Sequence, residues 1–275
     1  MNDGLAAAAD DALAVARRVH GNTVFERTAR AGFAVNGLLH VLIGALALSV
    51  ATGASGPADD ADPAGALRAV ADTPGGIVLV WVVAAGLAAL ALWLLLEAVL
   101  AHLLRGEVPR GLVVAAKAVA YGALAVPAVT ISLGGRVDTD DDVREISAFL
   151  VQSSPGIALL VLAGLGIVAI GVFFVVKGLR RTFLDDLATR GRDEARVITV
   201  LGVVGYVAKG LALVALGALL VTTAVTVDPG SAGGLDEALR AVAALPFGAA
   251  LLVIVALGLI VYGVYGMVRA RRARL

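Results

Sequence analysis

Hydrophobic positions gather in six long runs along the 275-residue chain, separated by shorter polar segments. Each run can cross the hydrocarbon core of a bilayer as a helix, which takes about 20 residues. Because lipid offers the backbone no hydrogen-bond partners, uninterrupted runs of this kind predict helices. The predicted spans are Ala31–Ala51, Gly75–Leu100, Leu112–Leu133, Gly156–Val176, Thr199–Val225 and Phe247–Val268. The predicted fold class is therefore an all-α integral membrane protein with six transmembrane helices.

The basic residues outside these runs predict the orientation of the chain. Sixteen Lys and Arg residues lie in the N-terminal segment, the second and fourth loops and the C-terminal tail, whereas four lie in the other three loops. Cytoplasmic segments carry the excess of basic residues in membrane proteins. We therefore expect a multi-pass protein of the bacterial cytoplasmic membrane with both termini in the cytoplasm. Before the first run, residues Leu5–Val19 form either a short amphipathic helix at the inner membrane surface or a disordered segment.

Short motifs recur along the chain. The hexapeptide Ala66–Ala71 returns unchanged as Ala238–Ala243, and a proline follows each copy within three residues. In the odd-numbered runs, the pattern of Gly32–Gly37 returns as Gly205–Gly210, with Val113–Ala118 as its middle copy. The chain is therefore predicted to repeat one unit three times.

Each predicted unit consists of a span outward, a short amphipathic helix in the outer loop and a span back. Because two spans preserve the orientation, the units are parallel, and we expect a pseudo-threefold arrangement about the membrane normal. The predicted division is a cytoplasmic segment, 1–30, followed by repeats at 31–104, 111–183 and 199–271.

These recurring motifs resemble a bacterial membrane family, found mainly in actinobacteria and called domain of unknown function 1206. The resemblance covers residues 29–271, which is nearly the whole chain. It implies the three-unit membrane architecture and no catalytic residues, because the family has no established activity. The middle copy departs from the pattern, since Val113 and Val114 replace the glycine and aromatic residue.

Aligning the three units brings Asn36, Lys117 and Lys209 to one position in the odd-numbered spans. At 100° per residue, small residues share an arc with this position, at 37, 118 and 210 and again at 44, 125 and 217. Small residues let membrane helices approach closely, so we expect the odd-numbered helices to line a central axis. The candidate polar site comprises Asn36, His40, Glu97, Lys117, Tyr121 and Lys209.

Two interpretations of this position remain open. A lysine at the centre of a membrane helix costs about 2.5–3.5 kcal/mol on insertion scales. The two lysines either reach the headgroups or pair with Glu97, the acid predicted inside the membrane, or they bind a ligand, an ion or a lipid headgroup.

Composition narrows the chemistry further. The chain has no cysteine and three histidines, and it carries no phosphate-binding, dinucleotide, zinc-protease or serine-hydrolase motif. We therefore expect no enzyme, no cofactor and no metal site, and Asp138–Asp142 lacks the spacing of a calcium loop. The formal net charge of zero gives no indication of nucleic-acid binding.

Two functions fit these observations. The first is a membrane scaffold or accessory subunit that contacts lipid or a membrane protein partner. The alternative is a binding or transport pathway for a small solute, an anion or a lipid headgroup, lined by the odd-numbered helices.

Overall fold

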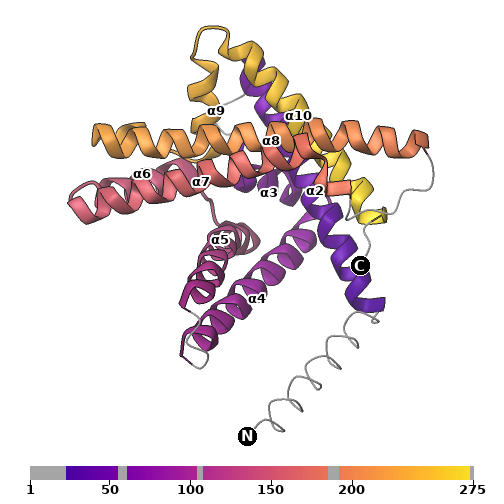
Figure 1. Cartoon of the computed structure of the whole chain (residues 1–275), viewed down its shortest axis with the longest axis horizontal. Coiled ribbons are helices and arrows are strands. Elements are labelled where there is room, and N and C mark those ends of the chain that lie inside the picture. The colour runs from indigo at the N-terminus through magenta and orange to yellow at the C-terminus, as the bar shows by residue number, and fades with distance from the viewer. Residues whose placement is uncertain (1–22, 55–60, 104–107, 185–191, 273–275) are drawn as a thin grey trace, which may run out of the picture.

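A computed structural model describes residues 23–54, 61–103, 108–184 and 192–272, and every element in these ranges is helical. Each predicted span falls within one of six long helices (Figure 1), apart from a terminal residue at some ends. These helices are α2 (Thr23–Thr52), α4 (Gly76–Leu103), α5 (Val108–Ser132), α7 (Ser154–Arg180), α8 (Arg192–Thr226) and α10 (Gly248–Arg272). The predicted N-terminal helix, Leu5–Val19, lies outside the described residues.

Four of the long helices are long and apolar enough to cross a membrane, namely α5, α7, α8 and α10. In the described parts of α2 and α4, the apolar stretches are shorter and comprise Asn36–Thr52 and Gly76–Leu92. The described part of the chain is therefore an all-helical protein with four candidate membrane-spanning helices.

A short helix follows the first long helix of each repeat, as the sequence predicted: α3 (Pro63–Ala71), α6 (Thr139–Leu150) and α9 (Leu235–Ala243). The Asp62 carboxylate caps α3 by accepting the backbone N–H of Gly65 at 2.7 Å, and Asp138 caps α6 through Asp141 N–H at 3.0 Å. Such caps satisfy backbone donors that have no partner within the helix. Two 3₁₀ turns, η1 (Thr182–Leu184) and η2 (Pro229–Ser231), complete the described elements.

The long helices pack as three antiparallel pairs, each built from two different repeats. Helix α4 packs against α5, α7 against α8, and α10 returns to pack against α2 (Figure 1). In addition, α8 packs against α10 within the third repeat. Each even-numbered span thus packs along the first span of the next repeat, and the last span packs along the first.

Small residues bring the paired helices together. A Cβ atom on Gly210 of α8 would lie 2.5 Å from the carbonyl oxygen of Gly171 on α7, and one on Gly37 of α2 would lie 2.6 Å from that of Gly263 on α10. Both distances are shorter than side-chain atoms tolerate, so only glycine permits these approaches. The predicted small-residue face therefore mediates close packing. Its partner, however, is the second long helix of another repeat, α7 for Gly210 and α10 for Gly37.

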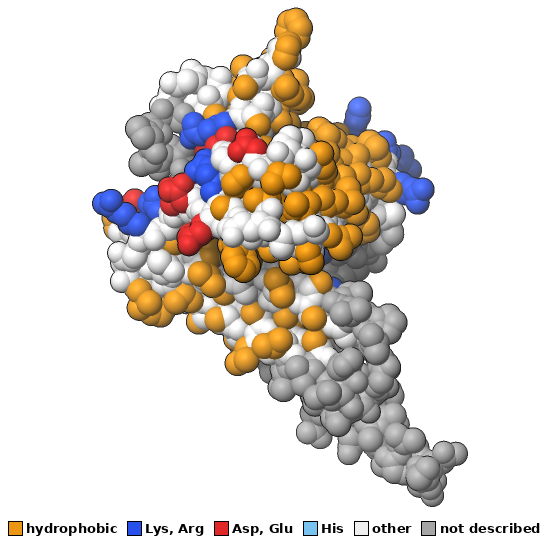
Figure 2. Space-filling model, turned by 90° about the vertical axis from the view of Figure 1, so that its left-hand side faces the viewer, with side chains coloured by type: hydrophobic (Ala, Val, Ile, Leu, Met, Phe, Trp, Pro, Cys, Tyr) orange, Lys and Arg blue, Asp and Glu red, His pale blue; other side chains and the backbone are white. Residues whose placement is uncertain are grey.

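The short helices α3 and α9 bury apolar residues between the long helices. Leu239 of α9 lies in one core with Ile43, Leu252 and Leu259, and Leu67 of α3 lies in another. Helix α3 also joins the α4–α5 pair to α2. On the face shown in Figure 2, acidic and basic side chains gather on the left and a second group of basic side chains lies at the right edge, with a wide hydrophobic surface between them, as expected for a protein in contact with lipid.

Candidate functional site

A cavity of about 280 Å³ lies between the long helices at the level of the repeated polar position. Its polar wall consists of Asn36 and His40 from α2 and Lys209 from α8. Apolar side chains form the remainder: Leu39, Ile43, Pro63, Leu124, Ala212, Leu213, Leu235 and Leu259. A mostly apolar cavity with a few convergent polar groups is typical of a small-molecule site.

The ammonium group of Lys209 is held by aromatic side chains. Its Nζ atom lies 4.6 Å from the ring centroid of Tyr262 on α10 and 5.0 Å from that of Phe174 on α7. It also donates a long hydrogen bond of 3.5 Å to the Tyr262 hydroxyl. Ring faces attract a cation by about 0.5–2 kcal/mol each, so these contacts offset part of the cost of burying the charge. Within the described residues, Lys209 makes no ion pair with a carboxylate.

His40 and Asn36 form the part of the polar wall that α2 contributes. His40 Nδ1 donates to the Asn36 carbonyl oxygen at 2.7 Å, which leaves Nε2 for another partner. The imidazole ring lies 4.7 Å from the ring of Tyr262. Tyr262 therefore contacts both His40 and Lys209, and it fixes the two polar groups relative to each other.

The structure brings three of the six candidate residues to this cavity. Lys117 and Tyr121 lie in α5, which contributes Leu124 to the cavity wall, and Lys117 is exposed. The Glu97 side chain lies outside the described part of the structure, so its predicted pairing with a lysine stays a prediction. The first long helices of the three repeats are α2, α5 and α8, and of these α2 and α8 form most of the cavity wall.

An aromatic cluster beside Lys209 was not expected from the sequence. Phe183, Tyr206, Tyr262 and Tyr265 are buried together, with Phe174 packed against them. Tyr206 contacts Tyr262 edge to face, with the ring centroids 5.2 Å apart. The available signal was local spacing, since Tyr262 and Tyr265 lie three residues apart on α10 and Tyr206 lies three residues before Lys209.

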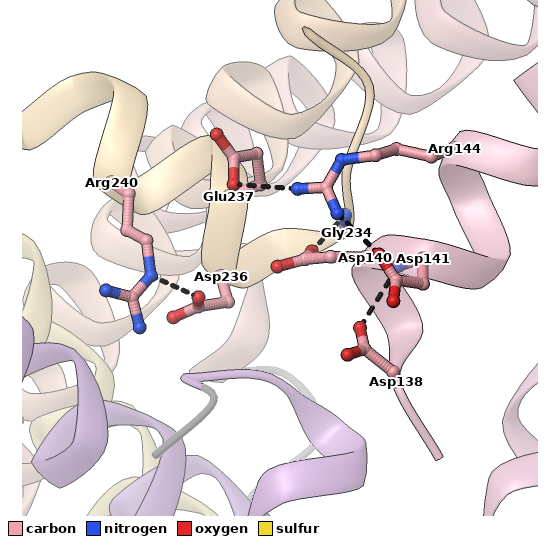
Figure 3. A network of polar contacts seen from close by, with 8 residues as sticks. All are labelled: Asp138, Asp140, Asp141, Arg144, Gly234, Asp236, Glu237 and Arg240. Carbon is pink, nitrogen blue, oxygen red and sulfur yellow. Dashed lines mark hydrogen bonds and ion pairs between the residues drawn. The ribbon is translucent and has the colours of Figure 1, made fainter. Parts of the chain in front are cut away.

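A second polar cluster links the short-helix segments of all three repeats, and Figure 3 shows its contacts between the second and third repeats. Asp140 accepts the backbone N–H of Gly234 at 2.7 Å, and Asp236 accepts that of Ala61 at 3.0 Å. Arg68 completes the connections by donating to the Val137 carbonyl oxygen at 2.6 Å. The first outer segment thus contacts the second, the second the third, and the third the first.

The carboxylates of this cluster have structural partners. Asp236 is buried and bonded to Arg240, while Arg144 bridges Asp141 and Glu237. Burial raises the pKa of Asp62, and the negative charges of Asp140 and Asp236 add to the rise, against hydrogen bonds that lower it. The described residues include no group of three or more side chains suited to hold a metal ion. The cluster therefore acts as a clasp between repeats.

Comparison with known proteins places this architecture in a family. A model for "Domain of Unknown Function (DUF1206)" matches three times, at residues 31–101, 112–181 and 204–273. The chain is also 30% identical over 250 residues to "Uncharacterized protein YxxB" of Bacillus subtilis (strain 168), an alignment that covers 89% of this chain and 90% of that protein. No solved structure matches. With three matches that together span most of its length, the chain belongs to the DUF1206 family.

Proposed function

We propose that this protein binds a small anion, or the anionic headgroup of a lipid, in the cavity lined by Asn36, His40 and Lys209. The observation that carries the proposal is the Lys209 ammonium, which adjoins a cavity and has no carboxylate partner among the described residues. An ion away from water is stabilised most effectively by an opposite charge. The Asn36 amide adds a hydrogen-bond donor, and His40 Nε2 adds a second polar contact.

The proposal favours the binding pathway over the scaffold. A scaffold needs no cavity between its helices, and it would not require a half-buried cation to lie in the wall of one. The apolar remainder of the wall suits an acyl chain or the hydrophobic part of an organic anion. We do not propose catalysis, because the cavity residues include no nucleophile adjacent to a base.

This function presupposes a membrane topology that we also propose. Six transmembrane helices with cytoplasmic termini, in a bacterial cytoplasmic membrane, are supported by the six long helices and by the distribution of basic residues. A pseudo-threefold arrangement is supported by the cyclic pairing of helices α2 with α10, α4 with α5 and α7 with α8. Thiol labelling of single-cysteine variants from either side of the membrane tests the topology, since the chain has no cysteine of its own.

Ligand-dependent stabilisation tests the anion site. The purified protein is heated in nanodiscs with phosphate, short-chain carboxylates or a fatty acid, and the unfolding temperature is followed. A ligand at a hundred times its Kd stabilises the folded state by about 2.7 kcal/mol, and we expect this effect to disappear in Lys209→Met. Lys117→Met serves as the matched control, because Lys117 lies outside the cavity wall. Equal stabilisation of wild type and Lys209→Met would refute the site, and stabilisation by the fatty acid alone would assign it to lipids.

A further inference from the structure

One glycine position recurs near the start of the second long helix of each repeat, namely α4, α7 and α10. Gly76, Gly156 and Gly248 form the same turn in each copy, because a Cβ atom on each would clash with the carbonyl oxygen six residues earlier. Counting ten residues onward from each gives a second set of equivalent glycines, Gly86, Gly166 and Gly258. A Cβ atom would meet open space at Gly86 and at Gly166, whereas at Gly258 it would meet a neighbouring helix.

In the third repeat this glycine packs against the preceding long helix. A Cβ atom on Gly258 of α10 would clash with the Ala208 side chain of α8. Ala208 and Ala212 are 6% and 3% exposed, and Tyr262, one turn after Gly258, is 6% exposed. Small residues on both helices thus create the α8–α10 contact that encloses Lys209.

The second repeat has the equivalent residues on α5 and on α7, but on both helices these residues are exposed or face open space. On α5, Ala116 and Ala120 occupy the positions of Ala208 and Ala212, and both are exposed. On α7, a Cβ atom on Gly166 would meet nothing within 4 Å. Ile170 and Phe173, at the positions of Tyr262 and Tyr265, are 52% and 59% exposed.

The α4–α5 pair is the part of the molecule whose position explains these open faces. Among the described residues, α5 does not pack along α7 and α4 does not pack along α2, whereas α3 contacts both members of the pair. In Figure 1 the pair lies apart from α7 and α8. Gly86 of α4 likewise has open space where a Cβ atom would be. One rigid-body movement of the α4–α5 pair about α3 would therefore bring α5 against α7 and α4 against α2.

We infer that the α4–α5 pair closes onto the rest of the molecule, so that α7 covers α5 as α10 covers α8. Closure packs Gly166 on Ala116 and places Lys117 beside Ile170, as Lys209 lies beside Tyr262. It removes an exposed ammonium from the surface of a candidate membrane-spanning helix, which lowers its cost in lipid. Because Leu124 of α5 lines the cavity, closure also reshapes the cavity wall. The inference rests on the helix contacts and not on what the cavity binds.

Disulfide formation tests the closure directly. The double variant Ala116→Cys/Gly166→Cys has no competing thiols, because the chain contains no cysteine. A protease site inserted at Gly134, between α5 and α6, allows the two halves to be separated on a non-reducing gel unless they are cross-linked. The control, Ala116→Cys/Leu165→Cys, moves the second thiol to the adjacent residue on a different face of α7, where Leu165 is 51% exposed.

We expect mild oxidation of membranes to cross-link the test pair within one chain about tenfold more than the control pair, since a disulfide requires Cα atoms closer than about 7 Å. Equal cross-linking of both pairs would overturn the inference, as would its absence from both. Cross-links formed only between two chains would also overturn it, because a second copy would then cover the α5 face. Reconstitution of both double variants in the reduced form checks that they fold.

Discussion

Replacing Gly171 by alanine tests whether the α7–α8 pair is as close as the structure shows. The added Cβ atom would lie 2.7 Å from the Gly210 carbonyl oxygen, 2.8 Å from Val214 Cγ2 and 2.9 Å from the Val214 backbone nitrogen. Two of these three neighbours are backbone atoms, so relief requires the helices to separate. Overpacking of this kind costs about 1–3 kcal/mol, while alanine in a helix recovers up to about 1 kcal/mol relative to glycine.

The expected net effect of Gly171→Ala is therefore a loss of about 1–2 kcal/mol in unfolding free energy. Equilibrium unfolding in mixed micelles of a mild detergent and dodecyl sulfate measures it. Gly122→Ala in α5 is the matched control, because a Cβ atom there would meet nothing within 4 Å, and we expect it to be neutral or stabilising. If the two variants are equally stable, α7 and α8 do not approach each other as closely as the structure shows.

Three further predictions concern other parts of the molecule. Burial raises the pKa of Asp62 above its usual 3.8, so the folded state binds this proton more tightly, and stability falls as the pH rises above about 4. Asp62→Asn keeps a capping side chain and should flatten that pH dependence in thermal unfolding, whereas an unchanged slope would exclude Asp62 as its source. Val227 follows the end of α8 and has a φ of 55°, a conformation that glycines adopt after the equivalent helices, at Gly53 and Gly134. Val227→Gly should therefore raise the stability by about 1 kcal/mol in the same measurement, and a loss of stability would contradict this backbone conformation. At Lys209, Tyr262→Phe keeps the ring and should change stability by less than about 0.5 kcal/mol, whereas Tyr262→Leu should cost about 1–2 kcal/mol; equal losses would show that the hydroxyl, not the ring, holds the ammonium.

The elements of this fold were predictable because lipid imposes them. A run such as Gly156–Val176 has no structural alternative to a helix, and the sequence located it within a few residues of α7. The outer helices were predictable for a related reason, since the hexapeptide Ala66–Ala71 recurs with a proline after it. Local chemistry and repetition were sufficient for both.

The pairing of the helices was not predictable from one sequence. Gly37 and Gly210 indicated close packing, but a small residue does not specify which helix approaches it. The partner of Gly37 is Gly263, at the other end of the chain, and the equivalence of the repeats does not distinguish that contact from one between two odd-numbered helices. Register between distant helices depends on the matching of both surfaces.

The candidate site was predicted in part for the same reason. Repeat equivalence identified Asn36 and Lys209 as one position, and the structure places both at one cavity. It does not bring Lys117 there, because α5 contributes one residue to the wall and packs mainly against α4. Tyr262 was missed, since it approaches Lys209 only through the packing of α8 against α10.

The most direct test of the central claim is the position of a bound anion. Crystals or lipidic-phase samples of the wild type, equilibrated with bromide, locate the ion by its anomalous scattering. We expect a bromide in contact with the Lys209 ammonium, in the cavity shared with Asn36 and His40, and no bromide there in Lys209→Met. A cavity without bromide in the wild type, or an equal occupancy in both proteins, would contradict the assignment of Lys209 as an anion-binding residue.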